Sequence, residues 1–313
     1  MNLDQIVAIE IERLLTQSEL SLEVVTIINS WLDYSFGTKG RFVFAQLTLA
    51  ICNSVGGELE VGLKGAIAME LYALAADILD DIQDQDNHDL PWRKVPAAQA
   101  INLATCILVL SYTAVSRLSK GSHIEAINNA LNQMGLNACD GQFQEFSNDA
   151  KDSISLADYF SIIMKKSGGF TAGACKIGAT LGGANQILSN QLEKFGMNLG
   201  VMNQIKNDQA DFLNLELKND FVQGRKTLPF VYLLTVLNKE KAEELKGLRT
   251  MANNGLEKFG QKEREQLSQL VLSEGTLHYC LVMYELYKKR ALEILQNIPL
   301  SKNRKEKLIE LVG

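Results

Sequence analysis

The sequence predicts an all-α protein, and three observations support this fold class. Only four prolines interrupt the 313 residues. Alternating runs of β-branched residues, closed by the turns typical of hairpins, are nearly absent. Apolar residues instead recur at steps of three and four, as they do between Leu59 and Leu74. We therefore expect a bundle of about ten helices, several of them buried on most faces.

The breaks between the periodic segments are short. They contain glycine, asparagine or proline and lie at residues 37–40, 56–57, 87–96, 168–169, 182–183 and 220–226. No segment has the composition of an interdomain linker. The expected organisation is therefore a single domain over residues 1–313.

Composition and charge narrow the classes of function. A net charge of −6 argues against nucleic acid as a partner, because binding to phosphate backbones needs a basic surface. The five cysteines are scattered and form no CxxC pair, which is typical of reduced thiols. The N-terminal segment carries acids and lacks a basic start followed by an apolar run, so it does not resemble a signal peptide. These features predict a cytoplasmic protein.

One uncharged stretch, residues 97–116, is long enough to span a membrane. Its polar side chains include Gln99, Asn102, Thr105, Ser111 and Thr113. A buried central helix accounts for this composition better than a membrane span does. We therefore expect no integral membrane segment.

An acidic cluster follows an apolar helical segment at LDDIQDQD, residues 79–86. Asp80 and Asp84 are four residues apart and share one helix face, with Asp81 beside them. Because like charges at this spacing repel, a helix accepts them more readily when a cation neutralises them. Carboxylate oxygens on a helix suit Mg²⁺, which completes its shell with water and phosphate oxygens. The alternative is a solvated acidic helix end.

A second polar cluster, QIKNDQAD at residues 204–211, again follows a mostly apolar segment. Asn207 and Asp211 are four residues apart, Asp208 is adjacent, and Gln204 lies one turn earlier. Two oxygen-rich faces at the ends of apolar helices are hard to explain as surface alone. If they faced each other across a bundle, they would form a cage for a polyanion and Mg²⁺ ions. The predicted metal ligands are Asp80, Asp84, Asn207, Asp208 and Asp211.

Basic residues lie in pairs at predicted helix ends and loops. The pairs are Lys39 and Arg41, Arg93 and Lys94, Lys165 and Lys166, and Arg225 and Lys226. Cations around a metal cage are what a diphosphate leaving group requires. Each lysine taken alone is better explained as a solvated surface charge.

Five segments occur in an order that resembles the isoprenyl diphosphate synthase family of trans-prenyltransferases. These are LDDIQDQD, GQFQE, YFSIIMKKSGG, QIKNDQAD and GRKTLP, which are similar to the family's DDxxD, GQxxD, Lys-Thr, second aspartate-rich and GKxTLP motifs. The resemblance implies an isoprenoid-synthase-like helical bundle that uses Mg²⁺ to ionise an allylic prenyl diphosphate. The implied catalytic residues are Asp80, Asp81, Asp84, Lys166 and Arg225. The implied diphosphate-binding residues are Gln142, Gln204, Lys39, Arg41 and Lys226.

The prenyl tail is expected to lie along the helix that carries the first motif. Tyr72, Ala75 and Ala76 lie one or two turns before the motif on its helix face. The two alanines are small enough for a tail to pass, and Tyr72 is the expected floor. This arrangement predicts a donor of C10 to C15, such as geranyl or farnesyl diphosphate.

The departures from the family pattern concern the second substrate, isopentenyl diphosphate. Ala73 replaces a histidine seven residues before the first motif, the N-terminal segment reads FGTKGRFVF, and Arg93 is displaced. Asn207 also opens the second motif in place of aspartate. This pattern resembles the ComQ-type peptide prenyltransferases of quorum sensing. It implies transfer of the prenyl group to a tryptophan of a pheromone precursor peptide.

Two other functions fit the same motifs. The first is a polyprenyl diphosphate synthase that condenses an allylic diphosphate with isopentenyl diphosphate. The second is a non-catalytic partner subunit, against which both metal-binding clusters argue. A homodimer is among the expected assemblies.

Overall fold

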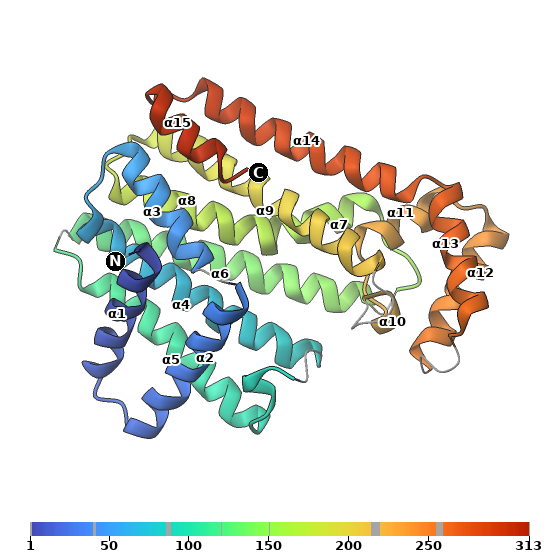
Figure 1. The fold of residues 1–313 in the computed structure, drawn as a ribbon, viewed down its shortest axis with the longest axis horizontal. Helices are drawn as coiled ribbons and strands as arrows, with labels where there is room; N and C mark the ends of the chain where they lie inside the picture. Colours follow the sequence, from blue (N-terminus) through green and yellow to red (C-terminus); the bar gives the residue numbers. More distant parts are fainter. Residues whose placement is uncertain are drawn as a thin grey trace. The chain divides into compact units, whose positions relative to one another are not determined.

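The computed structural model describes residues 2–39, 42–85, 89–119, 121–149, 151–213, 220–254 and 259–312. Every regular element within these ranges is a helix, which confirms the all-α prediction (Figure 1). The elements are α1 (Leu3–Thr16), α2 (Leu22–Lys39), α3 (Val43–Val55), α4 (Leu59–Asp84), η1 (Pro91–Arg93), α5 (Ala97–Ser116), α6 (Gly121–Asp149), α7 (Leu156–Ile163), η2 (Met164–Gly168), α8 (Gly169–Leu181), α9 (Gln186–Leu213), α10 (Asp220–Gln223), α11 (Leu228–Val236), α12 (Lys239–Asn253), α13 (Gln261–Ser273), α14 (Thr276–Asn297) and α15 (Lys302–Ile309).

The described residues form slightly more helices than the expected ten or so. In the last third of the chain, short boundary signals end one helix and begin the next. Asn238 caps α12 by accepting a hydrogen bond from Lys241 N, and Gly275 has a φ of +64° between α13 and α14. The break expected at Gly168 and Gly169 is also wrong, because η2 is a π-helical turn that leads directly into α8.

The chain forms two compact units. Unit 1 comprises Met1–Met134, Thr171–Gly196 and Ile294–Gly313, and unit 2 comprises Gly135–Phe170 and Met197–Glu293. The single domain expected over residues 1–313 stays a prediction.

Unit 1 is organised around α4, which packs against α3 and α5. Nearly all residues of α4 from Gly62 to Ala75 are buried, because their side chains are small or apolar on every face of the helix. This confirms a helix that is buried on most faces. The acidic end of α4 thus continues a rigid core helix.

Helix α5 is long and apolar enough to cross a membrane, with a mean hydropathy of 1.6. One face of it, including Ala100, Leu103 and Ile107, is buried, and α5 packs along α4. A core helix has these same properties, so this single helix is weak evidence for a span.

Unit 2 has its own apolar core in its second half. The buried members are Phe212, Phe221, Phe230, Leu233, Leu245, Leu248, Ala252, Phe259, Leu267, Leu270 and Val271. Their contacts join α9, α10, α11, α12 and α13. This core fixes the C-terminal end of α9, where the second polar cluster lies.

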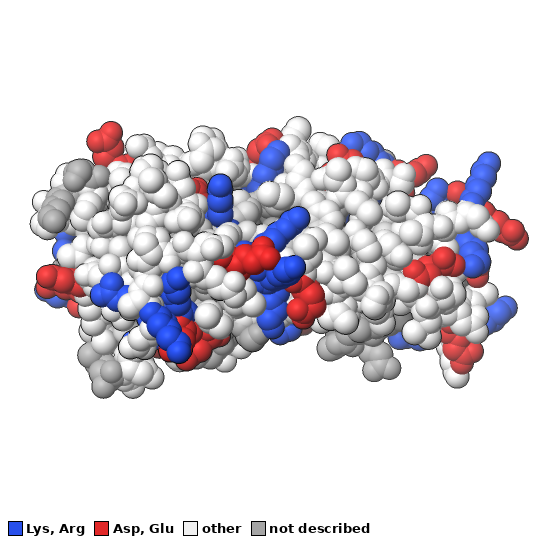
Figure 2. Space-filling model, turned by 90° about the horizontal axis from the view of Figure 1, so that it is seen from above, with Lys and Arg blue, Asp and Glu red and all other residues white. Residues whose placement is uncertain are grey.

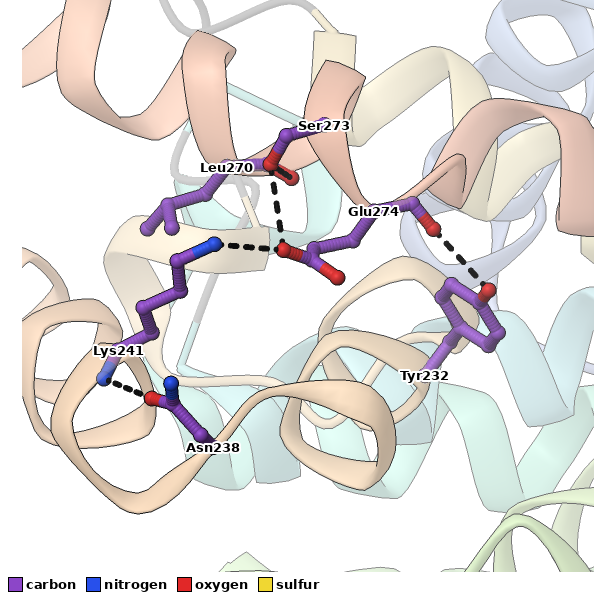
Figure 3. Close-up of polar contacts among 6 residues, drawn as sticks. All are labelled: Tyr232, Asn238, Lys241, Leu270, Ser273 and Glu274. Atoms are coloured by element: carbon purple, nitrogen blue, oxygen red, sulfur yellow. Dashed lines mark hydrogen bonds and ion pairs between the residues drawn. The ribbon is translucent and has the colours of Figure 1, made fainter.

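A polar junction supports the same part of unit 2 (Figure 3). The Lys241 Nζ donates to Glu274 Oε1 at 2.9 Å, which joins α12 to the end of α13. The Tyr232 hydroxyl on α11 donates to the backbone carbonyl of Glu274 at 3.1 Å. Three consecutive helices are therefore tied at one residue.

The surface drawn in Figure 2 is mostly uncharged. Its basic and acidic side chains are intermixed, without an extended field of either sign. This distribution agrees with the modest net charge of −6.

Candidate active site

The first acidic cluster lies at the C-terminal end of α4, in unit 1. Asp80, Asp81 and Asp84 are all partly exposed. The helix ends directly after them because Gln85 adopts a left-handed conformation, with φ 54° and ψ 31°. Asp80 and Asp84 are one turn apart on a regular helix, as their spacing predicts. Two carboxylates therefore share a face at the end of a core helix.

Asp81, the middle acid of this cluster, is held by a tryptophan. The indole Nε1 of Trp92, in η1, donates to Asp81 Oδ2 at 2.8 Å. Trp92 is only 5% exposed, and its indole donor needs an acceptor when it is buried. The hydrogen bond from Trp92 therefore orients the Asp81 carboxylate without a bound ligand.

The second polar cluster lies near the C-terminal end of α9, in unit 2. Asn207 and Asp211 are exposed, whereas Asp208 is only 3% exposed. Asp208 Oδ2 accepts from the Tyr159 hydroxyl at 2.6 Å and from the Leu228 backbone N–H at 2.9 Å. The metal ligation expected of Asp208 stays a prediction, but its carboxylate is engaged by the surrounding protein.

Gln204 links this buried acid to the π-helical turn. Its Nε2 donates to Asp208 Oδ1 at 2.7 Å, and its Oε1 accepts from the Ser167 hydroxyl at 2.5 Å. Ser167 belongs to η2, and π-helical turns of this kind are frequent at functional sites. Gln204 therefore connects its own motif, QIKNDQAD, to the motif YFSIIMKKSGG, which contains Ser167.

Desolvation raises the pKa values of three acids at and after the end of α9, namely Asp208, Asp211 and Asp220. Burial raises the pKa of Asp208 to about 6, against the opposing effect of its three hydrogen bonds. Burial, with the charges of Asp208 and Asp211, raises the pKa of Asp220 to about 7. The pKa of Asp211 is raised by burial and lowered by its hydrogen bond with Asp220. A cation bound here would offset this repulsion.

Glu145 holds two of the predicted catalytic cations. Lys166 Nζ lies 2.5 Å from Glu145 Oε2, and Arg225 Nη1 lies 3.6 Å from Glu145 Oε1. The Lys166 side chain is 23% exposed and the Arg225 side chain 13% exposed, so both pairs are partly shielded from water. The structure thus brings Lys166 and Arg225 together through one carboxylate in unit 2.

Glycine at 141 allows this close packing. A Cβ at Gly141 would lie 3.0 Å from Lys166 Cγ and 3.1 Å from Lys165 Cβ. A larger residue would therefore displace η2 and its lysines from α6. The neighbouring Gln142 of the same motif is buried.

The remaining predicted substrate-binding residues are placed as follows. Lys226 is buried in unit 2. In unit 1, Tyr72 and Ala75 are buried on α4 and Ala76 is partly buried. The side chain of Lys39 and the whole of Arg41 lie outside the described residues.

The donor set suits Mg²⁺, since paired side-chain oxygens on helices are ligands that this ion accepts. Asp80 and Asp84 in unit 1, and Asn207 and Asp211 in unit 2, are the residues that would hold it. Within the described part of the chain, no group of three or more His, Cys, Asp or Glu side chains is already assembled around a metal position. Each pair would therefore need water and diphosphate oxygens to complete the coordination.

Sequence reasoning missed three contributors to these clusters, Trp92, Tyr159 and Glu145. Glu145 and Tyr159 lie inside segments that were recognised as motifs, GQFQE and YFSIIMKKSGG, but no role was assigned to them. Trp92 lies in the segment NHDLPWRKV, where only the basic residues were considered.

An all-α fold that carries the pairs Asp80/Asp84 and Asn207/Asp211 on helices, and a lysine and an arginine on a shared carboxylate, has the groups expected of an isoprenoid-type prenyltransferase. The chain belongs to the polyprenyl synthetase family, because the model of that family matches residues 25–264.

The relatives include a tryptophan prenyltransferase and a prenyl diphosphate synthase. The chain is 26% identical over 284 residues to the tryptophan prenyltransferase ComQ of Bacillus subtilis strain 168, an alignment that covers 90% of this chain and 91% of that protein. It is 24% identical to a geranylgeranyl diphosphate synthase of Methanosarcina mazei, covering 85% of this chain and 83% of that protein.

A similar fold occurs in a solved structure, the polyprenyl synthase of Caulobacter crescentus CB15 complexed with calcium and isoprenyl diphosphate. The TM-score is 0.80 at 22% identity, with 99% of this chain and 94% of that chain covered. This similarity confirms the expected isoprenoid-synthase-like fold.

Proposed function

We propose that this enzyme transfers a C10 to C15 isoprenyl group from an allylic diphosphate to a tryptophan of a quorum-sensing pheromone precursor peptide. The similarity to ComQ supports this acceptor. The family membership supports the prenyl diphosphate donor.

The observation that carries the choice of acceptor is Ala73. It is 2% exposed on α4, at the position where the resemblance places a phosphate-binding histidine. A methyl group cannot donate a hydrogen bond to a second diphosphate. Each lost charge-assisted contact weakens phosphate binding by about 1.5–3 kcal/mol. An indole acceptor has no diphosphate and does not need this contact.

The donor side of the chemistry is retained. Lys166 and Arg225 would neutralise negative charge on the leaving diphosphate, and Glu145 would keep both cations in position. Mg²⁺ bound through Asp80 and Asp84 would supply further neutralisation of the same charge.

The reaction needs no nucleophilic side chain of the enzyme. Cleavage of the C1–O bond leaves its electron pair on the diphosphate and an allylic cation on the prenyl chain. An indole carbon of the peptide gives an electron pair to C1, and a proton is then released to diphosphate or water. The apolar wall of α4 would keep water away from the cation until the indole attacks.

The second candidate is a chain-extending polyprenyl diphosphate synthase. The similarity to the geranylgeranyl diphosphate synthase of Methanosarcina mazei supports it. In this case the electron pair that attacks C1 comes from the double bond of isopentenyl diphosphate.

The test is to incubate the purified protein with farnesyl or geranyl diphosphate, Mg²⁺ and labelled isopentenyl diphosphate, and to analyse the products by mass spectrometry. We expect no extended diphosphate. Efficient formation of a C15 or C20 diphosphate would establish the second candidate instead.

Cytoplasmic location, a homodimeric assembly and a single domain over residues 1–313 stay predictions that accompany this function.

A further inference from the structure

Three aromatic side chains form a cluster behind the first acidic motif, in unit 1. Trp31 and Tyr34 lie one turn apart on α2, and Trp92 lies in η1. The ring of Trp92 makes edge contacts with Trp31, at a centroid distance of 6.1 Å, and with Tyr34, at 5.9 Å. Trp31 and Trp92 are 2% and 5% exposed. We call Trp31, Tyr34 and Trp92 the aromatic cluster.

The aromatic cluster is connected to the acidic motif by one directed bond. An indole N–H can only donate, and the acceptor here is Asp81 Oδ2 at 2.8 Å. Hydrogen bonds to an ionised carboxylate are stronger and more directional than those to neutral acceptors. The position of the Trp92 ring is fixed by its aromatic neighbours, so the bond fixes Asp81 as well.

The location of Asp81 makes this bond relevant to the metal site. It lies next to Asp80 and less than one turn from Asp84, at the last turn of α4. A partner that orients a residue in this turn also restrains the helix end that carries both proposed ligands. Partners of this kind, outside the ligand set itself, commonly change metal affinity about ten- to a hundred-fold when they are removed.

We propose that Trp92 is a positioning residue for the Mg²⁺-binding end of α4, and that its indole responds when Mg²⁺ and diphosphate bind there. The proposal rests on the proposed function, because it requires that Asp80 and Asp84 bind Mg²⁺.

A purely structural role makes a different prediction. If Trp92 only fills space, Trp92→Phe lowers stability without changing the response to Mg²⁺. Trp31→Phe is the matched control, since it shortens a neighbouring ring of the same cluster and leaves the bond from Trp92 to Asp81 in place.

The sequence makes a direct optical test available. The chain has two tryptophans, Trp31 and Trp92, and both belong to the aromatic cluster. In Trp31→Phe the tryptophan emission comes from Trp92 alone, and in Trp92→Phe it comes from Trp31 alone. Each protein is titrated with Mg²⁺ in the presence of inorganic diphosphate, and calorimetry measures binding in parallel.

We expect a saturable change in Trp92 emission that follows the calorimetric binding curve. In Trp92→Phe, the Mg²⁺ concentration for half-saturation should rise about ten-fold, whereas Trp31→Phe should shift it less than about two-fold. If Trp92→Phe does not fold, the emission of Trp31→Phe carries the test alone.

Two results would overturn the proposal and are distinguishable from each other. In the first, calorimetry shows binding, but the Trp92 emission does not change or folded Trp92→Phe needs the same Mg²⁺ concentration as the wild type. This result removes the positioning role and leaves the proposed function intact. In the second, the wild-type protein does not bind Mg²⁺ and diphosphate. This result removes the proposed donor site together with the positioning role.

Discussion

The two acidic clusters have the same spacing but different surroundings. In α4 the outer pair is Asp80 and Asp84, and the middle acid Asp81 is partly exposed with an indole donor. In α9 the outer pair is Asn207 and Asp211, and the middle acid Asp208 is buried.

In both clusters the protein itself hydrogen-bonds to the middle acid. This follows from helix geometry, because residues i and i+4 share a face whereas residue i+1 is turned by about 100° from it. The difference lies in their surroundings, because the buried Asp208 accepts from Tyr159, Gln204 and Leu228, whereas the partly exposed Asp81 accepts from Trp92. We therefore expect the outer pairs to bind the ligand and the middle acids to stabilise the fold. The stabilisation by Asp208 in α9 should be larger than that by Asp81 in α4.

The largest expected effect is on catalysis, at the outer pair of α4. Asp80→Ala or Asp84→Ala should lower turnover by roughly two to three orders of magnitude, because charge neutralisation on the leaving group is lost. The helical content should persist, since removing one of several repelling acids does not weaken the fold. Steady-state kinetics and circular dichroism measure both effects.

Asp77→Ala is the control for this pair. Asp77 is exposed one turn earlier on the same helix, so its removal lowers the negative charge without removing a proposed ligand. Equal turnover in the wild type and in Asp80→Ala would contradict the metal assignment.

The next effect is on stability, at the middle acids. Asp208→Ala leaves the Tyr159 hydroxyl and the Leu228 N–H without their acceptor, which should lower the free energy of unfolding by about 3 kcal/mol. Asp81→Ala should lower it by about 1 kcal/mol, because Asp81 is more exposed than Asp208 and the Trp92 indole loses this acceptor. Urea denaturation measures both values, and an equal loss in the two variants would break the comparison.

The sequence was sufficient to predict the helical class and the shared helix face of each outer pair, because both depend on local periodicity. It was not sufficient for the middle acids, because most of their donors lie outside their own helix. Tyr159 is 49 residues from Asp208, and Trp92 is 11 residues from Asp81 across a turn. The π-helical turn η2 was also missed, since its Gly168 reads as a break although it allows close packing against Met197 of α9.

A smaller effect is expected on donor choice, and it sharpens the role of α4. Ala75→Phe should shift the preference from a C15 donor towards a C10 donor by roughly ten-fold in kcat/KM, because the added ring shortens the proposed tail path. Ala75 is fully buried, so folding of the variant is checked by its melting temperature. An unchanged preference in a folded variant would show that the tail runs elsewhere.

The smallest effect concerns the junction of α11, α12 and α13 in Figure 3. The ion pair with Lys241 lowers the pKa of Glu274. A lowered carboxyl pKa contributes stability above the pKa of the unfolded state, and this contribution is lost as the pH falls through the folded value. Glu274→Gln should therefore lower the melting temperature slightly at pH 7, and the difference from wild type should fade in acid.

Glu243→Gln is the matched control, since Glu243 pairs with Lys246 only one turn away in α12. It should change the melting temperature less than Glu274→Gln does, because the pair of Glu243 and Lys246 lies within one helix. The opposite ranking would argue against the junction as a support.

The central claim is that the donor side is intact while the acceptor has changed. The most direct test is a partition assay in one tube, with farnesyl or geranyl diphosphate, Mg²⁺, and equal concentrations of isopentenyl diphosphate and a tryptophan-containing precursor peptide. Mass spectrometry of both products gives the ratio of the two transfers. We expect prenylated peptide, with the added mass on tryptophan, and almost no extended diphosphate. A product mixture dominated by the extended diphosphate would contradict the account.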